Sequence, residues 1–183
     1  MTNKKLIRTI TEADIPLELV DKEVFAQLKA RDHTYVHARQ LKSSRDLLIS
    51  EDFSKCQGVC FLDDRNEVGA LAHNYSTHDP YDTLTGECTG GEYHLEDPRE
   101  IFDNLGRVLA VHVYHEHCYE WPQNWIKGAL ARIGIKKLVH IPIKSKHKGI
   151  FSRHIVHDVR NGSVYVFPTD FDAGFRFHPN GMR

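Results

Sequence analysis

The sequence predicts a single α/β domain in which mixed or antiparallel sheets are flanked by helices. Its 183 residues suit one domain, and 40% hydrophobic with 27% charged residues is a globular composition. Two pairs of apolar stretches, within 58–72 and 152–167, are each interrupted by a polar turn, which is typical of β-hairpins. Two further stretches, 21–30 and 123–133, are the main predicted helices.

Residues 1–35 are predicted to form a helical arm of this domain, with one helix over 21–30. Three apolar residues lie on one side of that helix: Val24, Phe25 and Leu28. Such a stripe indicates packing against a sheet. A short strand within 33–39 should follow.

The stretch from Ser50 to His73 contains the first hairpin. Its strands are expected at about 58–62 and 68–72, joined by the polar loop 63–67.

The register of this hairpin brings a thiol and an imidazole onto one face. A loop centred between Arg65 and Asn66 pairs His73 with Gly58, and side chains alternate along a strand. Cys56 and His73 then become diagonal neighbours, with Cβ atoms roughly 7 Å apart in a regular ladder. A cysteine beside a histidine at the open end of a hairpin can serve as nucleophile and base.

Several motifs around this hairpin occur in a characteristic order: Asp46–Ser50, Glu51–Lys55, Cys56, Val59–Asp63, Gly69–His73, 130–135, 153–158 and 161–166. Cys56 lies six positions after Ser50, and His73 lies seventeen positions after Cys56. In this order and spacing the chain, from about Val36 to Phe167, resembles the CheD family of chemoreceptor glutamine deamidases. More distantly it resembles the deamidase toxins related to cytotoxic necrotizing factor.

The resemblance implies a CheD-like sandwich and a protein-glutamine deamidase activity. Cys56 would be the nucleophile, His73 the general base and acid, and Ser50 the residue that orients the imidazole. No metal or organic cofactor would be needed. The partner would be a protein substrate with a surface glutamine, such as a chemoreceptor or a host protein.

Three positions depart from the family pattern. Ser50 stands where threonine is usual, and the small residues that usually precede the nucleophile are replaced by Asp52–Lys55. A glycine-rich strand end is replaced by His112–Trp121. These changes leave open a non-catalytic CheD-like binding module as an alternative.

A second alternative is a metal-dependent hydrolase built on His115 and His117. If the strand continues, these two histidines share a face while His112 points to the other side. Zinc would need a third ligand, such as His94 or His78, and neither HExxH nor a pair of CxxC motifs accompanies the cluster.

The remaining elements complete the predicted domain, 1–183. A polar loop over 74–91 could form one wall of a cleft. Later elements are expected as follows: a helix opened by 96–100, strands over 107–114 and 136–143, a helix over 123–133, and a hairpin of 152–158 with 163–167 around Asn161–Gly162. Residues 168–183 show no periodicity and are predicted to be an irregular tail.

The composition gives no indication of several classes of partner. A net charge of −1 gives no indication of a nucleic acid or an anionic membrane surface as partner. No apolar run approaches the ~20 residues that span a bilayer, and the start has no secretory h-region. The four cysteines, Cys56, Cys60, Cys88 and Cys118, have no disulfide-framework spacing, so a cytoplasmic location is expected.

Overall fold

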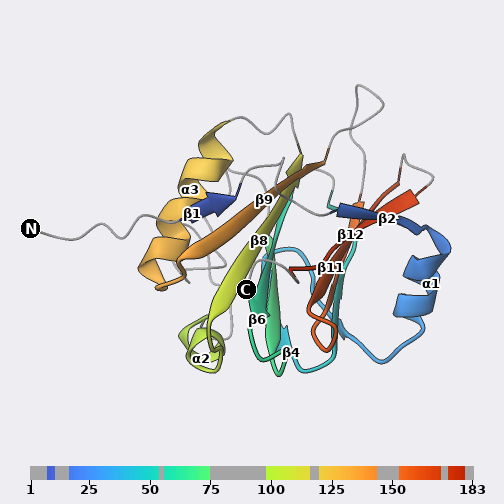
Figure 1. Ribbon diagram of the computed structural model, residues 1–183, viewed down its shortest axis with the longest axis horizontal. Helices are drawn as coiled ribbons and strands as arrows, with labels where there is room; N and C mark the ends of the chain where they lie inside the picture. The colour runs from blue at the N-terminus through green and yellow to red at the C-terminus, as the bar shows by residue number, and fades with distance from the viewer. Residues whose placement is uncertain are drawn as a thin grey trace, which may run out of the picture.

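Two six-stranded sheets packed face to face form the centre of the molecule, and helices cover their outer sides (Figure 1). This computed structural model describes residues 8–10, 17–53, 56–74, 98–115, 120–143, 153–169 and 173–179. The predicted α/β domain of mixed sheets flanked by helices is confirmed, with the sheets outweighing the helices.

Sheet A has the strand order β1-β9-β8-β6-β7-β4. The strands are β1 (Arg8–Ile10), β4 (Gln40–Ser44), β6 (Gln57–Asp63), β7 (Gly69–Asn74), β8 (Val108–His115) and β9 (Lys137–Ile143). β9 is parallel to both of its neighbours, and the other pairs are antiparallel. Two helices, α2 (Pro98–Asp103) and α3 (Glu120–Arg132), lie on the outer side of this sheet (Figure 1).

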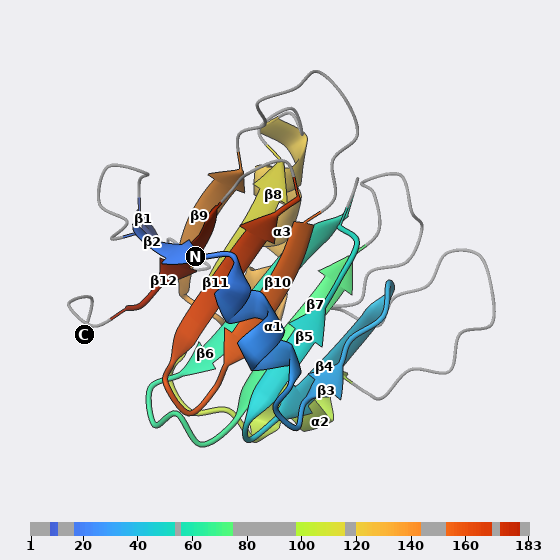
Figure 2. The same cartoon turned by 90° about the vertical axis from the view of Figure 1, so that its right-hand side faces the viewer.

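Sheet B has the strand order β2-β12-β11-β10-β5-β3. The strands are β2 (Leu17–Asp21), β3 (Thr34–Tyr35), β5 (Leu47–Ser50), β10 (Arg153–Asp158), β11 (Ser163–Pro168) and β12 (Ala173–Phe177). Only the short β3 is parallel to its neighbour β5. Helix α1 (Glu23–Lys29) crosses the outer side of this sheet, as Figure 2 shows.

Apolar side chains fill three layers. The layer between the sheets includes Cys60, Leu71, Val111 and Ile155, all fully buried. A second layer joins sheet A to α2 and α3, and a third joins sheet B to α1. Leu28 is buried in this third layer and Val24 and Phe25 pack against it, so the predicted stripe is confirmed. Within the described ranges, no helix has the length and apolar character that crossing a membrane requires.

Both ends of the domain contain a strand that the sequence did not predict. β12 lies in the tail expected to be irregular, and β2 lies in the arm expected to be helical. These two strands pair with each other in an antiparallel ladder. Gly174 makes β12 hard to recognise from the sequence, because glycine usually weakens a strand. Here the ring of Phe167 occupies the space that a Cβ at Gly174 would need.

Glycine is also required at the start of β7, and this generates a stability prediction. A Cβ at Gly69 would overlap the ring of His157 and lie 2.8 Å from Cγ2 of Val159. Gly69→Ala should therefore lower the free energy of unfolding by about 1–3 kcal/mol. Equilibrium urea denaturation measures this change.

Gly128, in α3, is the matched control. It is exposed, and among the described residues no atom lies within 4 Å of a Cβ built there. Gly128→Ala should raise the free energy of unfolding by about 0.5–1 kcal/mol, since alanine favours a helix interior. Equal effects of the two substitutions would contradict the packing at Gly69.

Candidate active site

The hairpin of β6 and β7 has the predicted register. His73 is paired with Gly58, and the ladder continues from Gln57 with Asn74 to Leu62 with Gly69. Side chains alternate between faces, so His73 points the same way as Leu71, into the space between the sheets. Cys56, two residues before Gly58, is buried in the same layer and only 4% exposed.

A hydrogen bond between the two sheets joins two of the predicted site residues. Ser50 ends β5 in sheet B, and its Oγ lies 2.9 Å from Nδ1 of His73 in sheet A. Both side chains are buried, at 0% and 3% exposure. The structure thus brings Ser50 and His73 together at the end of the sandwich where β6 begins and Cys56 lies.

The partners of Ser50 determine which imidazole nitrogen carries the proton. The Ser50 hydroxyl donates its one hydrogen to the carbonyl of Val36. Its oxygen must therefore accept the hydrogen on Nδ1 of His73. The neutral ring then has a bare lone pair on Nε2, which is buried and has no hydrogen-bond partner among the described residues.

Burial keeps this imidazole neutral. Burial, together with a smaller contribution from the positive charge of Arg153, lowers the pKa of His73 to about 4. At neutral pH the ring is therefore a base that can accept a proton on Nε2.

Phe53 fixes the plane of the ring. It stacks on His73 with centroids 3.7 Å apart and planes 17° apart. Its position is allowed by Gly58, because a Cβ there would lie 3.3 Å from the Phe53 ring and would overlap Cδ1 of Ile155. The imidazole is thus held by a hydrogen bond at its edge and by an aromatic ring on its face.

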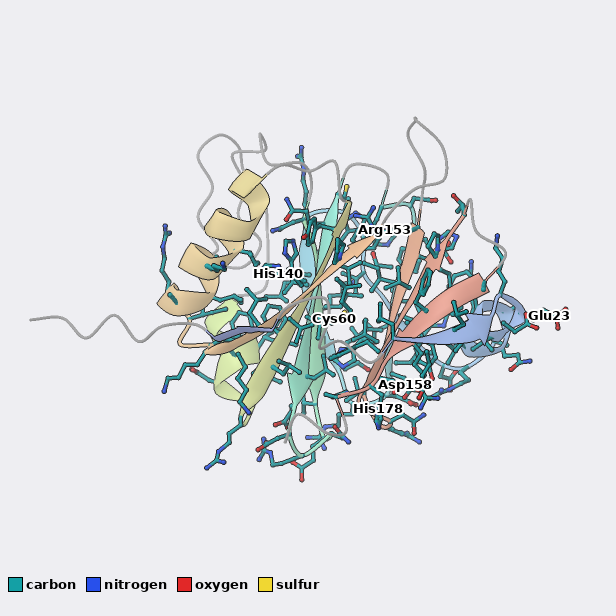
Figure 3. All side chains as sticks on the ribbon, turned by 45° about the horizontal axis from the view of Figure 1, so that its top comes forward. Glu23, Cys60, His140, Arg153, Asp158 and His178 are labelled. Atoms are coloured by element: carbon teal, nitrogen blue, oxygen red, sulfur yellow. The ribbon has the colours of Figure 1, made fainter. Side chains whose placement is uncertain are left out.

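Arg153, the first residue of β10, is a site residue that the sequence reasoning missed. Figure 3 shows it in the space between the sheets, where it is fully buried. Its Nη2 donates to the carbonyl of Cys56 at 2.6 Å, and its guanidinium carbon lies 5.9 Å from the centre of the Phe53 ring. One signal was present: a positive charge at a position of β10 whose alternate neighbours, such as Ile155, face the core.

A second polar cluster lies on the opposite face of sheet A, and Figure 3 shows one of its members, His140, on the side toward α3. Nε2 of His112 lies 2.7 Å from Oε1 of Gln57, and its Nδ1 lies 3.1 Å from Nδ1 of His140. Tyr114 stacks on His112 with ring centroids 5.0 Å apart. Burial lowers the pKa of both histidines, to about 4 for His140, so the pair is neutral.

The alternative metal site falls almost wholly outside the described residues. This applies to His78, His94 and His117, and to the side chain of His115. Among the residues that are described, no three His, Cys, Asp or Glu side chains are grouped to hold a metal ion. The loop over 74–91, expected as a cleft wall, is described only at Asn74.

A cavity of about 650 Å³ lies at the far end of the sandwich from this site. Its lining includes Leu62, Asp63 and Val108, at the end of β6 and the start of β8. Ser50, Cys56 and His73 take no part in it. The candidate active site is therefore identified by its polar geometry and not by this cavity.

Four buried histidines predict how stability depends on pH. Burial holds the pKa of His73, His140 and His157 at about 4, and it lowers that of His112 well below its usual value. Unfolded histidines bind protons near pH 6.5, so below that pH the unfolded state binds more protons than the folded state. The free energy of unfolding should fall as the pH is lowered from about 6.5 to 5, above the range of ordinary carboxylates.

Urea denaturation at several pH values measures this dependence. His157, between the sheets, is the position to substitute, because its Nδ1 lies 3.3 Å from the carbonyl of Ala70 and, among the described residues, it makes no hydrogen bond to Ser50 or His73. His157→Gln should reduce the slope of stability against pH. A stability that stays constant from pH 6.5 to 5 would contradict the neutral state of these rings.

No protein-family model matches the chain, and no curated protein matches it at a significant level.

Proposed function

We propose that the protein is a cysteine-dependent protein-glutamine deamidase of CheD-like type, which converts glutamine side chains of a target protein to glutamate with release of ammonia. The observation that supports this best is the Ser50–His73 hydrogen bond between the sheets. It leaves Nε2 of a neutral, oriented imidazole as a base at the same buried end as Cys56. An activated nucleophile requires such a base within hydrogen-bond reach of the thiol, and the free Nε2 of His73 is the group that can serve as that base for Cys56.

The first half of the reaction forms a thioester. Nε2 of His73 takes the proton of the Cys56 thiol as the sulfur attacks the carboxamide carbon of the substrate. The imidazolium then returns that proton to the departing nitrogen, so ammonia leaves and the acyl group stays on sulfur. Backbone N–H groups at Cys56 and in the loop before it would hold the oxyanion.

The second half regenerates the enzyme. His73 takes a proton from a water molecule, whose oxygen attacks the thioester carbon. The carbon–sulfur bond breaks, the product is a glutamate carboxyl group, and the proton returns to the thiol. No metal or organic cofactor takes part in either half.

Ser50 acts through His73. Its hydroxyl is committed as a donor to Val36, so it accepts from Nδ1–H and keeps Nε2 available. The same tautomer is imposed by the third residue of other catalytic triads. Ser50 stands where threonine is usual in the CheD family, and serine retains the hydroxyl group that this role needs.

The substrate of this proposal is a protein that presents a surface glutamine. A net charge of −1 provides no attraction for nucleic acid, and the reaction needs no membrane insertion. A reducing compartment such as the cytoplasm would keep the Cys56 thiol available.

Substitutions at the three proposed catalytic residues test the proposal. Cys56→Ala removes the atom that bonds to the substrate and should abolish activity. His73→Ala removes both base and acid and should cost at least roughly 10²–10⁴-fold. Ser50→Ala removes an orienting bond in a dry site and should cost about 1–3 kcal/mol in transition-state stabilisation, or roughly five- to 150-fold. Intact-mass analysis of candidate proteins, which gain one dalton per Gln-to-Glu conversion, measures the rate.

Cys60→Ala is the matched control. Cys60 lies on β6 between the sheets, is fully buried, and burial raises the pKa of its thiol far above the usual value. This variant should retain near wild-type activity, and iodoacetamide should label Cys56 before Cys60, Cys88 or Cys118. A Cys56→Ala protein that still deamidates, or a faster reaction at another cysteine, would refute the proposal.

A further inference from the structure

Arg153 is the fully buried cation that lies beside the proposed nucleophile. It comes from sheet B, whereas Cys56 leads into β6 of sheet A. The Nη2–carbonyl bond of 2.6 Å therefore connects the two sheets at Cys56. The main chain of Arg153 is fixed as well, because its carbonyl accepts the N–H of Phe53 at 3.1 Å.

Burial of a guanidinium is costly, and apolar residues of similar volume usually stabilise a core at least as well. Around Ile155 and Cys60 this inter-sheet layer is apolar, and the other buried polar side chains described in it, such as Ser50, His73 and His157, carry no fixed charge. A cation at this one position is therefore best explained by what it does at Cys56 and not by stability.

The proposed reaction has an electrostatic difficulty, which such a cation increases at the imidazole by lowering its pKa and offsets at the thiol by stabilising the thiolate. The pKa of His73 is about 4, whereas an ordinary thiol has a pKa of about 8.5. Proton transfer from sulfur to this imidazole is unfavourable unless the thiolate is stabilised. The sulfur of Cys56 is only a few covalent bonds from the carbonyl that Arg153 holds, so the guanidinium charge acts on it at short range.

We propose that Arg153 is a positioning residue for Cys56: its guanidinium clamps the backbone of the nucleophile from the opposite sheet and its charge favours the thiolate. This inference rests on the proposed function in taking Cys56 as the nucleophile. Its test uses the thiol alone and no substrate, so it can fail or succeed separately from deamidase activity.

A charge effect can be distinguished from mere loosening of the core. Removing a nearby positive charge should raise the pKa of Cys56, since the thiolate loses its stabilisation, and should also raise the pKa of His73. Loosening would admit water to both groups. It would raise the pKa of His73 but lower that of a buried thiol, because hydration favours the charged form of each. The direction of change at Cys56 therefore separates the two explanations.

The experiment compares Arg153→Met with Arg31→Met in the full chain. Arg31 is a suitable control because its guanidinium binds Asp158 at 2.8 Å and Asp46 at 3.1 Å on the outer side of sheet B. The rate of Cys56 modification by iodoacetamide, followed by peptide mapping from pH 5 to 10, gives the pKa of the thiol. NMR of the His73 ring gives the pKa of the imidazole.

Arg153→Met should raise the midpoint for Cys56 by about one pH unit or more, which makes modification at pH 7 roughly tenfold slower. The His73 midpoint should rise as well, and Arg31→Met should leave both midpoints near those of the wild type. An unchanged or lower Cys56 midpoint in folded Arg153→Met would overturn the inference.

A measurement on the wild-type protein decides the question if Arg153→Met does not fold. With ¹³Cζ-labelled arginine, the Arg153 signal should show a titration step at the Cys56 midpoint, and Cys56→Ala should remove that step. A signal of Arg153 that does not respond to ionisation of Cys56 would overturn the inference.

Discussion

The pairing of β6 with β7 is the constraint on which the site depends. It places His73 opposite Gly58 and thereby turns the imidazole toward sheet B, where Ser50 lies at the end of β5. A slip of one residue would turn the ring toward α3 and leave the Val36–Ser50 pair without its third member. Both faces of this hairpin are buried in apolar layers, so a slipped register would also misplace every core residue of two strands.

Burial in an apolar layer shifts the pKa of the few polar groups between the sheets. Burial makes His73 a weak but neutral base, and it makes the Cys60 thiol hard to ionise. The same low dielectric strengthens the effect of one guanidinium on everything around it. The electrostatics at this end of the sandwich therefore depend on the charges that the core contains, and among the described residues Arg153 is a fully buried cation that contacts the Cys56 carbonyl.

The sequence predicts what is local and periodic. The two hairpins, the helix stripe of α1 and the register at His73 follow from alternation and turn chemistry, and the structure confirms each of them. β12 could not be predicted, because its glycine is explained only by the ring of Phe167 from the adjacent strand. Arg153 and the His112–His140 pair were missed for a similar reason. Each acquires its partner from a strand distant in sequence, and periodicity gives no information on such pairs.

The pairing of β2 with β12 also bears on how the protein is made. These strands stand near opposite ends of the described sequence, yet they are neighbours in sheet B. During synthesis, β2 has no partner until β12, the most C-terminal strand described, has emerged from the ribosome. Until then β11 presents an open edge to other nascent chains, which is the kind of edge that promotes aggregation. Completion of sheet B is therefore a late step of folding, and until it occurs the open edge of β11 favours association with other unfinished chains.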